Sequence, residues 1–284
     1  MDALELVIAG ALAATLAASC LTGCSDDADG GTAKEAPCDV RPSADNTGAT
    51  GDLRRDSTAV VEEDGATLED VHLGSVEVRA DDVTLRNVRV DGNILVTGDG
   101  VTIDHVSTTG IAISSASKAE VRYSNIGGGA EDGIHVTSDR GRLATDITLS
   151  YNFVHSPEVP PGGHYDGTQV RGVDGLLVTC STYDAGPYES THNAAIYLED
   201  ANGGDANVAI EHNWLLGSGF SVMLDAPGTR LIGNRVAGDP HWGTCYLGPG
   251  TTPDALTIRD NVDEATGDPD PLCTASPSAA PGDS

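Results

Sequence analysis

The chain has 284 residues, with 35 glycines, 4% aromatic residues, and 15 basic against 44 acidic residues, which gives a net charge of −29. A chain of this length can bury a substantial core. Nucleic acids and anionic membrane surfaces would repel so acidic a protein, so the charge argues against both as partners. The charge fits solubility at high ionic strength and affinity for cations equally well.

The N-terminal stretch has the character of a targeting segment. Residues 4–21 are apolar and rich in Ala and Leu, and a Leu-Thr-Gly-Cys tetrapeptide that ends at Cys24 precedes an acidic run. This pattern resembles the lipobox of bacterial lipoproteins, so we expect residues 1–24 to be a lipoprotein signal peptide with the lipid on Cys24. An ordinary secretory signal with a small-residue cleavage site is the alternative. The lack of Lys or Arg before the apolar run departs from the lipoprotein pattern.

Both readings predict an exported, extracellular protein. No second apolar run is long enough to span a bilayer, so we expect membrane attachment only through the lipid anchor. In an oxidising compartment, Cys38, Cys180, Cys245 and Cys273 predict two disulfides, for which three pairings are possible. A bond from Cys273 to Cys245 would hold the C-terminal tail. No CxxC spacing occurs, so a zinc site built on cysteines is not expected.

The rest of the chain divides by composition. We expect a flexible tether and N-terminal cap over 25–55, a repeat domain over 56–262, and an acidic, Pro-rich tail over 263–284. In the repeat domain, short segments alternate apolar and polar residues with the strand period of two, and helical spacing is absent. Their turn positions are Asn87, His105, Asn125, Asn152, Ser181, Asn213, Asn234 and Asn261.

A second strand series lies between these segments. In each triplet the first and third residues point inward and the middle residue points outward. The triplets are 76–78, 94–96, 111–113, 134–136, 168–170, 196–198 and 222–224. Short strands in this arrangement predict a solenoid of stacked parallel strands, with the asparagines forming a ladder at one turn. A sandwich has strands every ~8–12 residues and a propeller has four strands per ~40-residue blade, and both fit less well.

Two motifs support a family resemblance. The chain resembles right-handed parallel β-helix proteins of the pectate-lyase-like superfamily over roughly residues 40–262. Within that superfamily it resembles secreted actinobacterial repeat proteins with an Asn-Thr-Gly, here at 46–48, and a His-x-Asp-Gly-x-Gln motif, here at 164–169. We therefore expect an all-β, single-stranded right-handed parallel β-helix of about eight coils, as a monomer.

The outward positions predict a site. Stacked coils lie about 4.8 Å apart, so outward residues at matching positions become neighbours. Polar groups concentrate on three consecutive coils, beside long loops at 138–145, 156–163 and 183–193. The candidate catalytic residues are Asp132, His135, His164, Asp166 and Arg171. The candidate substrate-binding residues are Gln169, His192, Asn193, Tyr197 and Glu199.

Each candidate also has a plain structural interpretation. The Asp-Gly pairs at Asp132 and Asp166 are frequent in turns, and Arg171 with Glu199 would make a surface ion pair of small energy. His135 and His192 could be ordinary solvated side chains. The clustering of these groups, more than any one residue, favours a site.

The resemblance implies a polysaccharide substrate and leaves three chemistries open. A β-eliminating lyase would use Arg171 or His164 as its base, and Ca²⁺ held by Asp132, Asp166 and Glu199 would neutralise a uronate carboxylate. A glycoside hydrolase would use two carboxyls, for which Asp132 and Asp166 are a pair. A C5-epimerase would use His and Tyr, but the Asp-Pro-His at 239–241 lies several coils away.

The catalytic sets of polygalacturonases (Asn-x-Asp, Asp-Asp and Gly-His-Gly) are missing, as is the Lys/Arg pair of alginate-lyase relatives. The sequence thus predicts a lipid-anchored β-helix that acts on or binds extracellular polysaccharide, as a lyase or hydrolase of acidic glycans if catalytic. The alternative is a non-catalytic glycan-binding, structural or adhesive protein of the cell surface.

Overall fold

The computed structural model describes residues 38, 40–217, 219–237, 239–270 and 272–273. The predicted signal peptide with Cys24, the tether before residue 38, and the end of the tail at 274–284 lie outside the described residues. Within them the regular structure consists of β-strands and one 3₁₀ turn, Pro253–Ala255. No helix in the described part is long and apolar enough to cross a membrane.

One sheet has nine parallel strands, each taken from a successive turn of the chain. Its strands are β2 (Ala59–Val61), β4 (Val76–Val78), β6 (Asn93–Val96), β9 (Gly110–Ser114), β12 (Ile134–Thr137), β15 (Tyr165–Arg171), β18 (His192–Leu198), β21 (Phe220–Leu224) and β24 (Gly243–Leu247). The seven predicted triplets all lie in this sheet. The structure adds β2 and β24 at its two ends, so the described chain makes one more turn than the eight expected.

A second sheet has seventeen strands in two adjoining series. The first series is β1 (Arg54–Arg55), β3 (Thr67–Leu73), β5 (Thr84–Val90), β7 (Thr102–Asp104), β10 (Glu120–Arg122), β13 (Ala144–Ser150), β16 (Val173–Thr179), β19 (Asp205–Glu211), β22 (Arg230–Ile232) and β25 (Thr257–Arg259). The second is β8 (Ser107–Thr108), β11 (Asn125–Gly127), β14 (Phe153–His155), β17 (Thr182–Asp184), β20 (Trp214–Leu216), β23 (Arg235–Val236) and β26 (Val262–Asp263).

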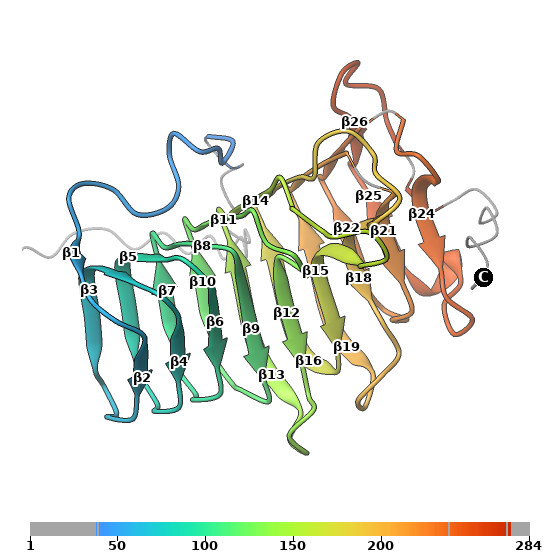
Figure 1. The fold of residues 1–284 in the computed structure, drawn as a ribbon. Helices are drawn as coiled ribbons and strands as arrows, with labels where there is room; N and C mark the ends of the chain where they lie inside the picture. Colours follow the sequence, from blue (N-terminus) through green and yellow to red (C-terminus); the bar gives the residue numbers. More distant parts are fainter. Residues whose placement is uncertain (1–37, 39, 218, 238, 271, 274–284) are drawn as a thin grey trace, which may run out of the picture. The chain divides into compact units, whose positions relative to one another are not determined.

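Successive strands within each series pair in parallel, so the chain winds as a solenoid (Figure 1). This confirms the prediction of an all-β, right-handed parallel β-helix. Inward residues such as Ile134, Val136 and Ile196 are fully buried in one continuous core. Burying each of these side chains contributes about 1.5–3 kcal/mol, so a regular apolar alternation is enough to specify the fold.

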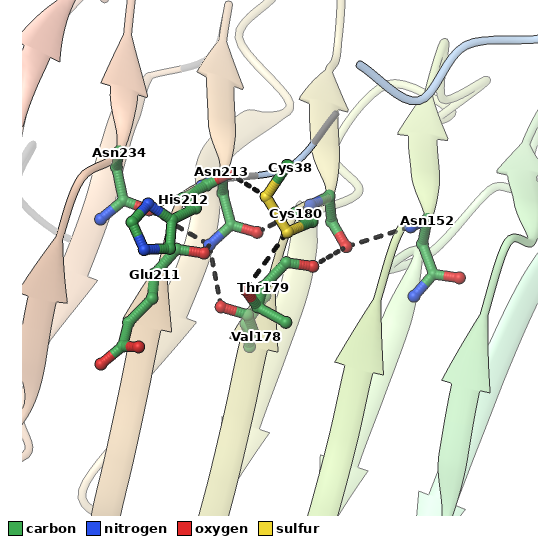
Figure 2. The surroundings of a disulfide bond; sticks show 10 residues. Cys38, Asn152, Val178, Thr179, Cys180, Glu211, His212, Asn213 and Asn234 are labelled. Atoms are coloured by element: carbon green, nitrogen blue, oxygen red, sulfur yellow. Dashed lines mark hydrogen bonds between the residues drawn. A yellow bond between two sulfur atoms is a disulfide. The ribbon is translucent and has the colours of Figure 1, made fainter. Parts of the chain in front are cut away.

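An asparagine ladder does form, but its register differs from the prediction in the first coils. The ladder column contains Ser124, Asn152, Ser181, Asn213, Asn234 and Asn261, whose side chains are buried. Asn213 Oδ1 accepts the Ser181 N–H at 3.0 Å, and its Nδ2 donates to the Val178 carbonyl at 2.9 Å (Figure 2).

The predicted turn positions Asn87, His105 and Asn125 each lie one residue away from this column. Asn87 and His105 belong to a neighbouring row with positive φ, and Asn125 begins β11. Ser107 pairs with Asn125 in the sheet, which puts Val106 beside Ser124 in the ladder column. The apolar Val106 occupies the ladder position there, so the asparagine pattern alone misplaces these three turns.

Two disulfides connect the four predicted cysteines, as Cys38–Cys180 and Cys245–Cys273. The second pairing is the one expected to hold the tail. The first joins residues 142 apart in sequence and ties the N-terminal segment to the turn row beside Asn213 (Figure 2). Closing so long a loop in the unfolded chain stabilises the fold by about 5 kcal/mol in the chain-entropy description.

Candidate functional site

The strand register places three of the predicted site residues in one row across three consecutive strands. His135 of β12 pairs with Gln169 of β15, which pairs with Tyr197 of β18. This confirms the predicted order of outward residues along the nine-stranded sheet. One member of the row differs: Met223 on β21 is only 8% exposed, because aromatic side chains cover it.

Asp166 is the most deeply buried residue of the site, with no exposed surface. Its Oδ1 accepts hydrogen bonds from Asn193 Nδ2 and from the Ala194 N–H, both at 2.9 Å. The strand pairing shifts here, because Tyr165 pairs with His192 whereas Asp166 pairs with Ala194. Asn193 is therefore the extra residue of a β-bulge. The bulge directs the Asn193 amide and the Ala194 N–H to the same carboxylate oxygen of Asp166.

His164 lies in the loop before β15, and its side chain is 55% exposed. Its Nε2 lies 2.7 Å from Asp166 Oδ2, so the second ring nitrogen, Nδ1, is left for other partners. The hydrogen bond to Asp166 raises the pKa of His164, although partial burial opposes the change. Burial in turn raises the pKa of Asp166, while His164 and the other donors lower it.

Asp132 comes from the preceding coil, just before β12. Its Oδ1 accepts the Asp166 N–H at 2.8 Å, which fixes its carboxyl beside the His164–Asp166 pair. One ligand atom from each of these three residues lies within 4.8 Å of the other two. Burial, followed by the negative charge of Asp166, raises the pKa of Asp132 to about 6. The site thus holds a carboxyl and an imidazole whose pKa values are both raised above their ordinary values.

Arg171 and Glu199 form the ion pair that the plain interpretation predicts, with Nε and Oε2 3.0 Å apart. Both side chains remain partly exposed at the edge of the site. Burial, and then the charge of Arg171, lowers the pKa of His135, and His135 Nε2 has no hydrogen-bond partner among the described residues. His135 is therefore neutral at physiological pH, beside a charged pair.

His192 differs most from its expected role as a solvated or substrate-binding side chain. It is 3% exposed, its ring lies tilted against Tyr165, and burial lowers its pKa. A side chain in that position supports the strand next to the site. Gln169, Asn193, Tyr197 and Glu199 are partly exposed, as expected of residues that face a substrate.

A metal ion has a limited set of ligands here. The predicted Ca²⁺ ligands Asp132 and Asp166 do lie together, but their third neighbour is His164, and Glu199 pairs with Arg171 instead. Ca²⁺ prefers six to eight oxygen ligands, whereas the Asp166 oxygens already accept three hydrogen bonds. These residues do not fit Ca²⁺.

Aromatic residues beside the site were not predicted from the sequence. Trp242 and His241 lie in the loop before β24, and Tyr188 lies in the loop before β18. Tyr188 stacks on His241 with ring centroids 3.7 Å apart, and its edge meets the Trp242 ring at 5.3 Å. The long loop at 183–193 was the one available signal, because it borders the motif at 164–169.

No protein-family model matches this chain, and no curated protein sequence matches it. Among solved structures, the chain is similar to an alginate lyase from Paenibacillus sp. str. FPU-7, at 14% identity and a TM-score of 0.35, over 71% of this chain and 79% of that one. A GH136 lacto-N-biosidase from Eubacterium ramulus aligns at 12% identity and a TM-score of 0.31, over 74% of this chain and 44% of that one. These similarities do not assign a reaction to the site.

Proposed function

We propose that this protein is an exported glycoside hydrolase that cleaves extracellular polysaccharide at Asp132 and His164. The observation that carries the proposal is the arrangement of a half-exposed imidazole on a fully buried carboxylate, next to a second carboxyl with a raised pKa. Paired groups whose environments shift their pKa values are typical of acid–base sites.

The protonation states assign the roles. Near pH 7 the Asp132 carboxyl, with a pKa of about 6, has lost its proton, whereas the raised pKa of His164 favours its protonated form. His164 Nδ1–H can then protonate the glycosidic oxygen while the Asp132 carboxylate attacks the anomeric carbon. Water that gives its proton to His164 would release the sugar from Asp132 in a second step. Asp166 holds the imidazole and, being buried, does not touch the substrate.

The short separation favours this two-step reaction over direct attack by water. Inverting enzymes keep their two groups roughly 6.5–9.5 Å apart to accommodate a water molecule, and retaining enzymes roughly 5–5.5 Å. A carboxyl oxygen of Asp132 and a ring nitrogen of His164 lie within 4.8 Å of each other, which is nearer to the retaining separation. Elimination from a uronate needs a positive group for the sugar carboxylate, and the candidate guanidinium, Arg171, already pairs with Glu199.

Export rests on two observations. The lipobox at Cys24 and the two disulfides both fit a protein that folds outside the cytoplasm. We propose that Cys24 carries the lipid and that the β-helix acts as a monomer on glycans at the cell surface. Cleavage of the chain before Cys24, with lipid on the new N-terminus, can be read directly by mass spectrometry of membrane-extracted protein.

The reaction is tested by incubating the purified chain with a panel of uncharged and uronate polysaccharides, with and without EDTA. We expect new reducing ends that persist in EDTA, no ultraviolet absorbance from an unsaturated product, and a first-formed sugar of retained anomeric configuration by NMR. Asp132→Asn and His164→Gln should each lower the rate by roughly 10²–10⁴-fold.

Two matched variants control for non-specific effects. Glu131→Gln removes the exposed carboxyl next to Asp132, and His105→Gln removes another imidazole held by an aspartate at 2.7 Å, on the other sheet. Both should keep the full rate. An unsaturated product would overturn hydrolysis in favour of elimination. Loss of activity in EDTA would show that catalysis needs a metal ion. If affinity gels show retardation by a glycan but no product forms, the remaining interpretation is a protein that binds glycans without cleaving them.

A further inference from the structure

A second apolar cluster, separate from the main core, lies next to the candidate site. Ala194, Phe220 and Met223 are buried in it, and partly exposed aromatic side chains pack on them. We call these rings, together with the Tyr188 ring that meets Trp242, the aromatic wall; its members are Tyr188, Tyr197, Trp242 and Tyr246. None of the four has a part in the acid–base chemistry.

The wall continues the site along the same sheet. Tyr197 pairs with Gln169 on one side and with Met223 on the other, and Met223 pairs with Tyr246. A Cβ atom on Gly219 would collide with both the Trp242 ring and the Asn193 carbonyl oxygen, so both residues lie close to Gly219. Asn193, which donates to Asp166, lies on the same strand as Tyr197. The wall therefore begins one coil beyond the His164–Asp166 pair.

Neighbouring side chains hold the rings in place. Phe220 lies 5.5 Å from Trp242 and 5.8 Å from Tyr246, between ring centroids, and the Tyr188 ring lies parallel to that of His241 within 5°. Fixed rings lose little conformational entropy on binding. An aromatic ring offers an apolar face with a polar edge, which suits the C–H face and the hydroxyl groups of a sugar ring.

The charges around the site disfavour an anionic glycan. The negative charges of Asp132 and Glu199 act on His164, and the Arg171 guanidinium already pairs with Glu199. The whole chain carries a net charge of −29, which repels polyanions at long range. An uncharged sugar meets no such repulsion.

We propose that the aromatic wall binds uncharged glycosyl units next to the bond held at Asp132 and His164, and that it makes the protein selective for uncharged polysaccharides over polyuronates. This inference rests on the proposed function for the position of the reacting bond. It assigns substrate selection to residues one to three coils away from the His164 motif in sequence.

Fluorescence provides a local readout, because the chain has only two tryptophans, Trp214 and Trp242. Trp214 begins β20 on the other sheet and is also partly exposed, so Trp214→Phe and Trp242→Phe are matched substitutions. With Trp242 as its only tryptophan, the protein should show a saturable emission change with at least one of xylan, galactomannan, mixed-linkage glucan and soluble starch. With Trp214 alone it should show none.

Affinity gels measure selectivity and the contribution of a single ring. Tyr188→Ala, in a loop, should weaken retardation by the bound uncharged polymer about tenfold, which corresponds to the loss of one stacked ring. Tyr123→Ala removes a tyrosine that stacks between His105 and Tyr151 on the other sheet, and it should leave retardation unchanged. Polygalacturonate and alginate should retard no form of the protein at low salt.

The outcomes separate this inference from the proposed function. Binding that depends on Tyr188 and Trp242 but yields no product would support the wall and overturn the hydrolase. Product formation at the same rate and KM in Tyr188→Ala and Trp242→Phe would overturn the wall and leave the hydrolase. Retardation by a polyuronate would overturn the proposed selectivity. Failure of every uncharged polymer to retard the protein would overturn it as well.

Discussion

His164 Nε2 and Asp166 Oδ2 lie 2.7 Å apart, and they join an imidazole that is 55% exposed to a carboxylate that has no exposed surface. The pair therefore spans the boundary between solvent and the folded interior. The other oxygen of Asp166 is held by Asn193 and Ala194, so the carboxylate cannot turn away from the ring. This anchoring gives the imidazole one orientation and one proton arrangement.

Asp166→Asn tests this relationship. The asparagine oxygen can still accept from Asn193 and Ala194, but its amide would then face His164 Nε2 as a donor and favour the wrong tautomer. We expect kcat to fall roughly 10²–10⁴-fold, with KM little changed. Because Asp166 raises the pKa of His164, the alkaline limb of the pH profile should also move to lower pH.

A matched pair controls for the loss of a His–Asp contact in general. His72 on β3 of the other sheet has its Nε2 2.7 Å from Asp91 Oδ1, so Asp91→Asn removes the same type of bond. It should leave kcat and the pH profile unchanged. A reduced kcat in Asp166→Asn with the alkaline limb unmoved would mean that Asp166 only maintains the fold.

The wild-type pH profile should be bell-shaped. Asp132 must be ionised to act as the nucleophile, so kcat/KM should rise as pH passes through about 6. His164 must be protonated to act as the acid, so the rate should fall again as pH passes its raised pKa. Steady-state rates from pH 4 to 10 on the best substrate of the panel measure both limbs.

Asp205 also titrates within the pH range of that profile, because burial raises its pKa to about 7. Its Oδ1 accepts the Gly172 N–H, outside the hydrogen-bonded group at Asp166. Asp205→Asn should therefore retain both limbs. An acidic limb that disappears in this variant would contradict the role assigned to Asp132.

The fold could be predicted from sequence because its signal is local. The triplets 134–136, 168–170 and 196–198 each bury two apolar residues with a spacing of two, and any strand with that pattern must turn the same face inward. Aligning the triplets was enough to place His135, Gln169 and Tyr197 in one row. The ladder was misaligned where Val106 and Ser124 replace asparagine, because no amide marks the column there.

The site was only partly predictable because its geometry depends on contacts between coils. The bulge at Asn193 turns an outward motif residue, Asp166, into a buried acceptor, and no feature within the motif itself indicates this. The same holds for Trp242, whose position depends on the missing side chain of Gly219. Spacing identifies which strands are neighbours, whereas bulges and loop packing decide which side chains remain exposed.

Asp205 also makes a prediction about stability. Its folded-state pKa of about 7 exceeds the ordinary value of 3.8, so the native protein keeps the proton in a range where the unfolded chain has lost it. Its contribution to stability is therefore greatest below pH 4 and is lost as pH rises to about 7. Asp205→Asn keeps the acceptor for Gly172 without the charge, and it should raise the free energy of unfolding at pH 8 by about 1–3 kcal/mol.

The gain from Asp205→Asn should be smaller at pH 4, where the native carboxyl is protonated. Urea unfolding at pH 4 and at pH 8 measures the two gains in the free energy of unfolding. Asp174→Asn is the matched control, because Asp174 is exposed and accepts a hydrogen bond from Asn207. An equal gain at pH 4 and pH 8 would show that the Asp205 carboxyl does not hold its proton in the native state.

Asn213→Ala tests how much the asparagine ladder contributes to the free energy of unfolding. The Asn213 side chain has no exposed surface, and Asn213→Ala would leave the Ser181 N–H and the Val178 carbonyl without their partners. Two buried polar groups without partners should cost about 2–4 kcal/mol, read as a lower urea midpoint with the disulfides intact. Asn93→Ala removes an exposed asparagine from β6 and should change stability by less than about 0.5 kcal/mol. If both variants unfold at the wild-type midpoint, the apolar core and the backbone pairing alone hold the coils together.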